Sequence, residues 1–373
     1  MKSTITAGTL MAIAVITAAA GSPARASRAY TLPINQMVVF GDSLSDTGNL
    51  TNLLSGTAYA SDAAAPPYYA SGEFTDGANT DPSTTILGLW DQQFAADLNL
   101  PSPTPALSTS FLSTYLLTGG YSLIPGGTNF AVAGSVTGNT VINLAANQFQ
   151  AGMSTQVAAY ESQFTAGTSV NTNSLYAFWG GANDILNAAS ASGATQNSVI
   201  SAGTAAANNI SGYIGNLAAH GAKYFLWFNL PPLNATPEES TSSLAGAIGT
   251  ASSDFNSTEA TDAAALLSSN PGIRIITVDI NTLFNTMAAN PSAYGFFNVV
   301  KPAQGLPVNP NQYLFWDKLH PTTAADSFVA QAAAADTINA LGIPTPEPAE
   351  LALLLTGFGL AFARRSHRRR RSH

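Results

Sequence analysis

Four short runs of consecutive apolar residues, which alternate with longer helix-type segments, constrain the fold of this chain more than any other feature. The runs lie at 37–40, 174–179, 223–228 and 273–278, and the helix-type segments lie at 153–164, 198–220, 241–267 and 322–341. Strands that are apolar on both faces are typical of a parallel sheet covered on both sides. The alternation therefore predicts a three-layer α/β/α sandwich with right-handed crossovers, formed by residues 27–343.

Composition and charge exclude several classes of protein. The chain has no cysteine, which rules out a disulfide framework, a thiolate zinc site and a cysteine nucleophile. It has four histidines, too few to favour a histidine-rich metal site, so we expect no metal. Residues 30–343 carry four basic and nineteen acidic side chains, a net charge of −15. Because phosphate binding needs clustered Lys and Arg, we expect no nucleic-acid partner.

The two ends of the chain are typical of targeting segments. Residues 1–26 hold a lysine, an apolar stretch and a small-x-small cleavage site, which predicts a signal peptide rather than an N-terminal membrane helix. Residues 344–373 hold Pro-Glu-Pro, thirteen mostly apolar residues and six arginines. As a helix the apolar part would extend about 20 Å, less than a hydrocarbon core of about 30 Å. This order resembles the PEP-CTERM sorting signal of Gram-negative bacteria; a plain C-terminal membrane anchor is the alternative.

One serine stands where α/β sheets place reactive groups. Ser43 lies in Gly-Asp-Ser at the carboxyl end of the first apolar run, and Asp42 and Asp46 are expected to shape its loop by accepting backbone hydrogen bonds. A serine nucleophile needs a base, and His320 precedes the last helix-type segment with Asp317 three residues before it. Asp317 would fix the tautomer of His320, which leaves Nε2 to take a proton from Ser43.

Residues 27–343 hold one other histidine, His220, and two glycine-rich stretches that bear on the site. His220 ends a long helix-type segment, where a cationic side chain is favoured, so we interpret it as structural. Acyl transfer also needs hydrogen-bond donors for the developing oxyanion. The glycine-rich stretches 126–135 and 180–184 could supply them, through the Gly134 amide and the Asn183 side chain.

Taken together, these segments resemble the GDSL esterase/lipase family, also called the SGNH hydrolases. The similarity lies in Phe-Gly-Asp-Ser-Leu-Ser at 40–45, Asn-Phe-Ala-Val-Ala-Gly at 129–134, Gly-Ala-Asn-Asp at 181–184 and Asp-Lys-Leu-His-Pro at 317–321. The resemblance implies a flavodoxin-like sheet of five parallel strands and no cofactor. It also implies Ser43 as nucleophile, Asp317 and His320 as its partners, and an oxyanion hole of Ser43, Gly134 and Asn183.

From the resemblance we expect a secreted serine esterase or lipase that forms an acyl-enzyme on Ser43. Two alternatives remain: an acyltransferase on the same site, and a non-catalytic surface or matrix protein on a degenerate hydrolase fold. The sorting signal implies processing by an exosortase, transient membrane anchoring by the C-terminal helix and delivery to the cell surface.

The substrate is left open between a lipid and an acylated carbohydrate. Residues 55–125 interrupt the strand–helix alternation, and we expect them to form an insertion over the carboxyl edge of the sheet. Their aromatic side chains either line a groove for an acyl chain or a sugar, or pack the insertion down. They are Tyr59, Tyr68, Tyr69, Phe74 and Trp90.

Overall fold

The computed structural model describes residues 32–55, 72–76, 88–139, 141–143, 148–164 and 170–343. The predicted signal peptide and sorting signal lie outside these residues, as do Tyr59, Tyr68 and Tyr69. No helix among the described residues is long and apolar enough to cross a bilayer.

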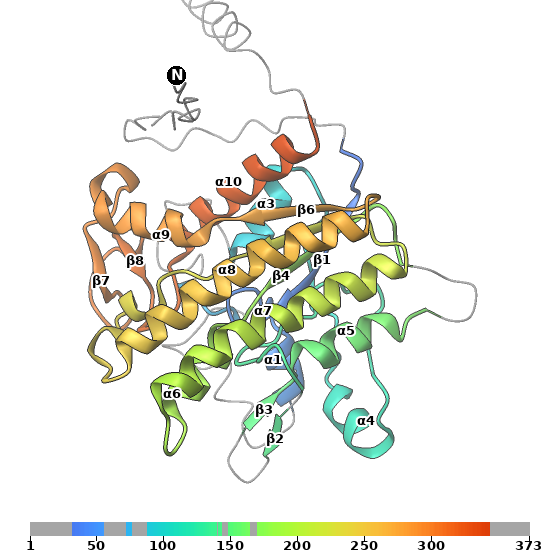
Figure 1. The fold of residues 1–373 in the computed structure, drawn as a ribbon, viewed down its shortest axis with the longest axis horizontal. Coiled ribbons are helices and arrows are strands. Elements are labelled where there is room, and N and C mark those ends of the chain that lie inside the picture. The colour runs from blue at the N-terminus through green and yellow to red at the C-terminus, as the bar shows by residue number, and fades with distance from the viewer. Residues whose placement is uncertain are drawn as a thin grey trace, which may run out of the picture.

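A parallel sheet of four regular strands forms the centre of the molecule (Figure 1). Its order is β1 (Gln36–Gly41), β4 (Ser174–Trp179), β5 (Tyr224–Phe228) and β6 (Arg274–Val278). Each strand coincides with a predicted apolar run to within one residue at either end. The match follows from burial, since nearly every residue of β1, β4 and β5 is buried.

The fifth position of the expected sheet is filled by an extended segment rather than a regular strand. Residues 128–132 run along the free edge of β1, where the Val39 amide donates to Thr128 and the Phe130 amide donates back to Val39. The pairing is reduced to a single parallel bridge between Val39 and Asn129. The ladder stops there because the Gly41 amide, the next donor of β1, donates to the Gln156 side chain instead of to this segment.

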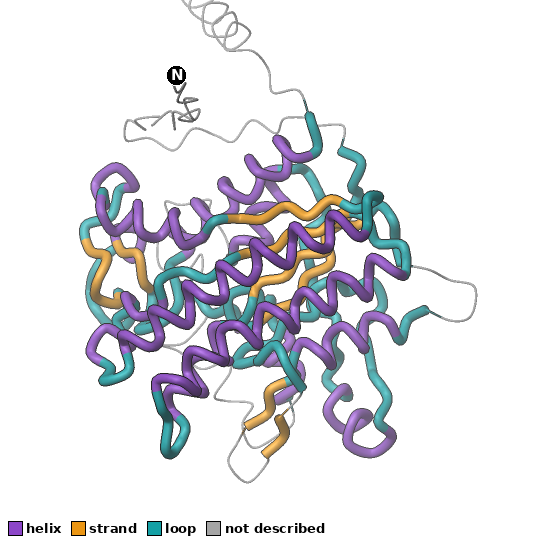
Figure 2. The backbone as a smooth tube through the Cα atoms, viewed as in Figure 1, coloured by secondary structure: helices purple, strands orange, loops and turns teal. Residues whose placement is uncertain are grey.

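Helices cover both faces of the sheet (Figure 2). One face carries α5 (Met153–Glu161), α6 (Ala182–Ser190), α7 (Gln196–Ala219) and α8 (Ala245–Ser269). The other carries α3 (Trp90–Asp97), α9 (Ile280–Ala289) and α10 (Thr323–Ala340). Alternate residues of β1 contribute to the two cores, Val38 and Phe40 to the first and Met37 and Val39 to the second. The predicted α/β/α sandwich is therefore present.

The described part of the expected insertion does not lie as one piece over the carboxyl edge of the sheet. Its helix α3 belongs to the second helical layer and packs against α10, because Trp90 and Phe94 are completely buried beneath it. Trp90 therefore lines no groove; of its two expected roles it has the packing one, and it packs this segment into the main core.

Smaller elements complete the described chain. They are α1 (Asn49–Leu54), α4 (Phe111–Thr118), the antiparallel pair β2 (Val141–Asn143) and β3 (Gln148–Gln150), the parallel pair β7 (Asn298–Pro302) and β8 (Tyr313–Phe315), and the 3-10 turns η3 (Leu233–Ala235), η4 (Glu239–Thr241), η5 (Pro291–Tyr294) and η6 (Pro310–Gln312).

Candidate active site

Ser43 follows directly from the end of β1. A Cβ atom on Gly41 would lie 2.3 Å from the Trp179 carbonyl oxygen, so only glycine lets the ends of β1 and β4 approach this closely. The Gln156 side chain of α5 then pairs with both backbone groups of Gly41, accepting from its N–H at 2.9 Å and donating to its carbonyl at 2.8 Å. The backbone that leads to Ser43 is therefore held from two sides.

Ser43, His320 and Asp317 form one hydrogen-bonded row. The distance from Ser43 Oγ to His320 Nε2 is 2.8 Å, and that from His320 Nδ1 to Asp317 Oδ2 is 2.7 Å. Asp317 Oδ1 also accepts from the backbone amides of Leu319 at 2.7 Å and His320 at 2.6 Å. Ser43 and His320 are 7 % and 9 % exposed, which leaves the row shielded yet reachable.

The electrostatics of this row favour an ionised aspartate. Burial alone would raise the pKa of Asp317, but the positive charge that His320 can carry and the hydrogen bonds from His320 and Leu319 hold that pKa well below its ordinary value. A carboxylate that stays ionised fixes the proton of His320 on Nδ1 and stabilises the imidazolium that forms when Nε2 takes a proton.

The loop that carries His320 is held by residues 72–76. The Thr75 hydroxyl contacts the Pro321 carbonyl at 3.2 Å, and Asp76 accepts from the Thr323 amide at the start of α10. The Phe74 ring lies against the imidazole of His320, with 5.1 Å between the ring centroids. Phe74 therefore contacts the site, in contrast to Trp90.

A tight turn places Gly134 beside the end of β1. The Ser135 amide donates to the Val132 carbonyl, and Gly134 has a φ of 76°, as the third position of a type II turn requires. The Val132 amide donates to Gly41, which joins this turn to the nucleophile loop. Within the described part of the chain, the backbone amides of Ser43 and Gly134 donate to no acceptor.

Asn183 approaches the same turn from the first residues of α6. Its Nδ2 donates to the Ser135 carbonyl at 3.0 Å, and the second hydrogen of that amide remains for another acceptor. Gly181 precedes the helix with a φ of 108°, and a side chain there would also meet the Phe255 ring. These contacts bring all three expected oxyanion donors to the carboxyl edge of the sheet.

Asp46 ties the nucleophile loop to that turn. Its Oδ1 accepts from the amides of Gly48 and Asn49, and its Oδ2 accepts from Leu50 and, at 2.8 Å, from Ala133 next to Gly134. Complete burial outweighs these hydrogen bonds and raises the pKa of Asp46 to about 6.

Asp42 accepts from the Leu44 amide through Oδ1 at 3.1 Å. Its Oδ2 is buried without a partner among the described residues. Burial raises the pKa of Asp42 to about 7, although the Leu44 amide and His320 act in the opposite direction.

Sequence reasoning missed several side chains that hold the site together. Gln156 contacts the Ser135 hydroxyl besides Gly41, and Asp184 accepts from both the amide and the hydroxyl of Thr137. Asn129 joins the Ser45 carbonyl to Asp91. Asp184 and Asn129 lie within the motifs quoted above, so their place in the sequence could have identified them as site residues. No motif pointed to Gln156, because Gly41, the residue of the nucleophile strand that it holds, is 115 residues away along the chain.

His220 lies away from this site. It is the C-cap residue of α7, with Nδ1 2.9 Å from the Asn216 carbonyl, and β5 begins four residues later. It therefore sits at the amino end of the strands, whereas Ser43 follows the carboxyl end. No group of three or more His, Asp or Glu side chains among the described residues is arranged to hold a metal ion.

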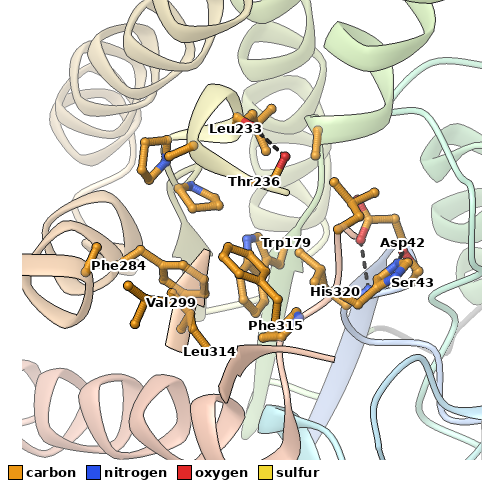
Figure 3. Close-up of a pocket in the computed structure, with 18 of the residues that line it drawn as sticks. Asp42, Ser43, Trp179, Leu233, Thr236, Phe284, Val299, Leu314, Phe315 and His320 are labelled. Atoms are coloured by element: carbon orange, nitrogen blue, oxygen red, sulfur yellow. Dashed lines mark hydrogen bonds between the residues drawn. The ribbon is translucent and has the colours of Figure 1, made fainter. Parts of the chain in front are cut away.

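A cavity opens from Ser43 and His320 (Figure 3). Asp42, Ser43 and His320 lie at one end, with Phe284, Val299 and Leu314 at the other, and Trp179 and Phe315 between them. Its described lining comes from η3, α9, β7 and β8 and from the loops that carry Ser43 and His320. Among the described residues of the segment expected to form a groove, Phe74 contacts His320.

A three-layer α/β/α fold that brings a serine, a histidine and an aspartate into one hydrogen-bonded row defines a serine-hydrolase type of site. More particularly, the chain belongs to the GDSL-like lipase/acylhydrolase family, whose sequence profile it matches over residues 37–333. Members of that family hydrolyse carboxylic esters.

The chain is also 28 % identical over 167 residues to the anther-specific proline-rich protein APG of Arabidopsis thaliana. That match covers 39 % of this chain and 31 % of the relative, so the chain spans about a third of the length of the curated relative it matches.

Proposed function

We propose that this protein is a serine esterase that cleaves carboxylic esters through an acyl-enzyme on Ser43. The observation that carries the proposal is the contact of 2.8 Å between Ser43 Oγ and His320 Nε2, in a row that Asp317 completes. Membership of a family of ester hydrolases supports the same reaction.

In the first half of the reaction, Ser43 Oγ attacks the ester carbonyl carbon while its proton passes to His320 Nε2. The carbonyl oxygen becomes an oxyanion, for which the amides of Ser43 and Gly134 and the Asn183 side chain are the candidate donors. The bond to the alkoxy oxygen then breaks, and the alcohol leaves with the proton that His320 returns.

In the second half, a water attacks the acyl carbon and gives its proton to His320. The bond to Ser43 Oγ breaks, His320 returns the proton to Ser43, and the carboxylic acid leaves. Asp317 stays ionised throughout and stabilises the imidazolium of each half.

Replacing Ser43 tests the proposal directly. We expect Ser43→Ala to lower kcat/KM for p-nitrophenyl acetate by at least about 10³-fold, because the nucleophile is lost. Ser113→Ala on the exposed face of α4 serves as control and should keep the parent rate. A fluorophosphonate probe should label the peptide that contains Ser43 in the parent and not in Ser43→Ala. Equal rates of the two proteins, or a parent without activity and without labelling, would favour the non-catalytic alternative.

We infer in addition that the protein is exported and sorted to the cell surface. The proposal is supported by the signal-like residues 1–26 and by the Pro-Glu-Pro, apolar and arginine order of residues 344–373. Mass spectrometry of the protein from its own cells should then find Ser27 as the first residue and the arginine cluster removed. An intact chain recovered from the cytoplasm would contradict it.

A further inference from the structure

The cavity beside Ser43 is polar at one end and apolar along the rest of its length. Asp42, Ser43 and His320 lie together at the polar end (Figure 3), and the Asn183 side chain also lines the cavity. Beyond them the wall consists mainly of apolar side chains, which include Leu233, Phe284, Val299, Leu314 and Phe315. This distribution matches a ligand with one polar group and a hydrocarbon tail.

Two polar side chains occur in the apolar part, and each makes a hydrogen bond within the protein. The Thr236 hydroxyl donates to the Leu233 carbonyl at 2.8 Å, and Asn285 Nδ2 donates to Asn281 Oδ1 at 3.0 Å. No Lys, Arg, Asp or Glu other than Asp42 lines the cavity within the described part of the chain. A sugar ring there would bury most of its hydroxyl groups without partners, which is unfavourable, whereas a methylene chain has no hydrogen bonds with water to lose.

We propose that this cavity binds an unbranched aliphatic chain of the ester substrate, and that Val299 on β7 helps to set the chain length it accepts. The inference rests on the proposed esterase function and deepens it: of the two substrate classes left open by the sequence, it selects a lipid ester rather than an acylated carbohydrate. The aliphatic chain can belong to the acyl or to the alcohol part of the ester, since both parts are bonded to the carbonyl carbon that Ser43 attacks.

Val299 and Val300 form a matched pair for testing this assignment. They are adjacent in β7, and successive side chains of a strand point to opposite faces. Val299 is half-buried and lines the cavity, whereas Val300 is 65 % exposed and lies outside the lining. Val299→Phe should therefore narrow the cavity, and Val300→Phe adds the same ring on the other face.

The first measurement is the ratio of kcat/KM for octanoate to that for acetate, with p-nitrophenyl esters and the full chain. Each methylene that enters the cavity is expected to raise kcat/KM about fourfold until the cavity is filled. The ratio should thus be well above ten in the parent, fall at least tenfold in Val299→Phe and stay unchanged in Val300→Phe. A parallel series of acetate esters of ethanol, butanol and octanol shows whether the chain belongs to the alcohol instead.

The second measurement does not depend on turnover. The Ser43→Ala protein is titrated with octanoate and with 1-octanol, and binding is followed by the fluorescence of Trp179, which lines the cavity. Val299→Phe in this background should weaken binding at least tenfold, and Val300→Phe should not.

Two results would overturn the inference and leave the esterase proposal intact: Ser43-dependent hydrolysis with no chain-length preference in either ester series, or a Val299→Phe ratio equal to that of Val300→Phe. Failure of the esterase proposal gives a different pattern, in which no ester is hydrolysed whatever its chain. In that case the titration tests the cavity assignment separately. If neither octanoate nor 1-octanol binds, the cavity assignment is overturned as well.

Discussion

At the scale of single residues, the site depends on short polar side chains that hold backbone groups at the carboxyl edge of the sheet. Gln156 holds Gly41, Asp184 holds Thr137, and Asp46 connects the nucleophile loop with the turn of Gly134. A buried acceptor that fixes several amides is costly to remove, because those amides lose their partners. The activity of this protein should therefore be sensitive to residues that never contact the substrate.

Asp46 gives the sharpest prediction of this kind. Asp46→Ala removes the acceptor of four backbone amides, among them Ala133, and should lower the free energy of unfolding by about 2–4 kcal/mol. Because Gly134 then loses its anchor, kcat for p-nitrophenyl acetate should fall at least about tenfold in molecules that remain folded.

Asp46→Asn is the conservative counterpart, since it keeps one acceptor oxygen. It should recover part of both losses, in urea unfolding and in kcat. If Asp46→Ala loses stability but keeps the parent kcat, then Asp46 supports the fold alone and does not position the turn.

At the scale of elements, the second helical layer contains an unusual group of acidic residues where α3, α10 and residues 72–76 meet. Asp326 is completely buried in the first turn of α10. Burial raises its pKa well above 3.8, and the negative charges of Asp76, Asp91 and Glu73 raise it further.

Asp326 makes the stability of this layer depend on pH. Because its pKa is higher in the folded protein, the unfolded chain ionises first as the pH rises from about 4, and the free energy of unfolding then falls until the folded pKa is passed. Asp326→Asn, which is always neutral, should thus raise the free energy of unfolding by about 1–3 kcal/mol at pH 8 and leave it nearly unchanged at pH 4.

Chemical unfolding at both pH values tests this expectation. Asp262→Asn on α8 is a suitable control, because a partly exposed substitution away from such a group should change stability little at either pH. An equal gain at pH 4 and pH 8 would show that the effect of Asp326→Asn does not come from ionisation.

At the scale of the whole molecule, one sheet serves two cores. Phe225 and Trp227 of β5 belong to the core beneath α7 and α8, while Leu226 and Phe228 belong to the core beneath α3 and α10. Both cores pack against the same strands. If one core loses its packing, one face of each of these strands is uncovered, and the stability of the two layers is therefore coupled.

We therefore expect the protein to unfold in one cooperative step. In urea, tryptophan fluorescence should report both cores, since Trp227 lies in one and Trp90 and Trp179 lie in the other. Its transition should coincide with that of the far-ultraviolet circular dichroism. Two separate transitions would show that the layers are independent folding units.

The sequence alone determined the central sheet and the chemical core of the site. The strands were predictable because residues buried on both faces must all be apolar, a pattern that needs no knowledge of the partner strands. The resemblance and the chemistry of a base led to Ser43, Asp317 and His320, and Asp317 lies only three residues from His320, within the reach of one turn. Patterns of this kind involve residues close along the chain, so they can be recognised in the sequence alone.

Only the tertiary structure decided the rest. It placed Trp90 in the core, reduced the fifth strand to a bridge at Asn129, and built the apolar cavity between β7 and α9. Each of these depends on contacts between segments far apart in the chain, such as Asn129 with Ser45 and Asp91. Such contacts leave no repeating pattern in a single sequence. They depend on how whole elements pack together and not on the spacing of residues that are close along the chain.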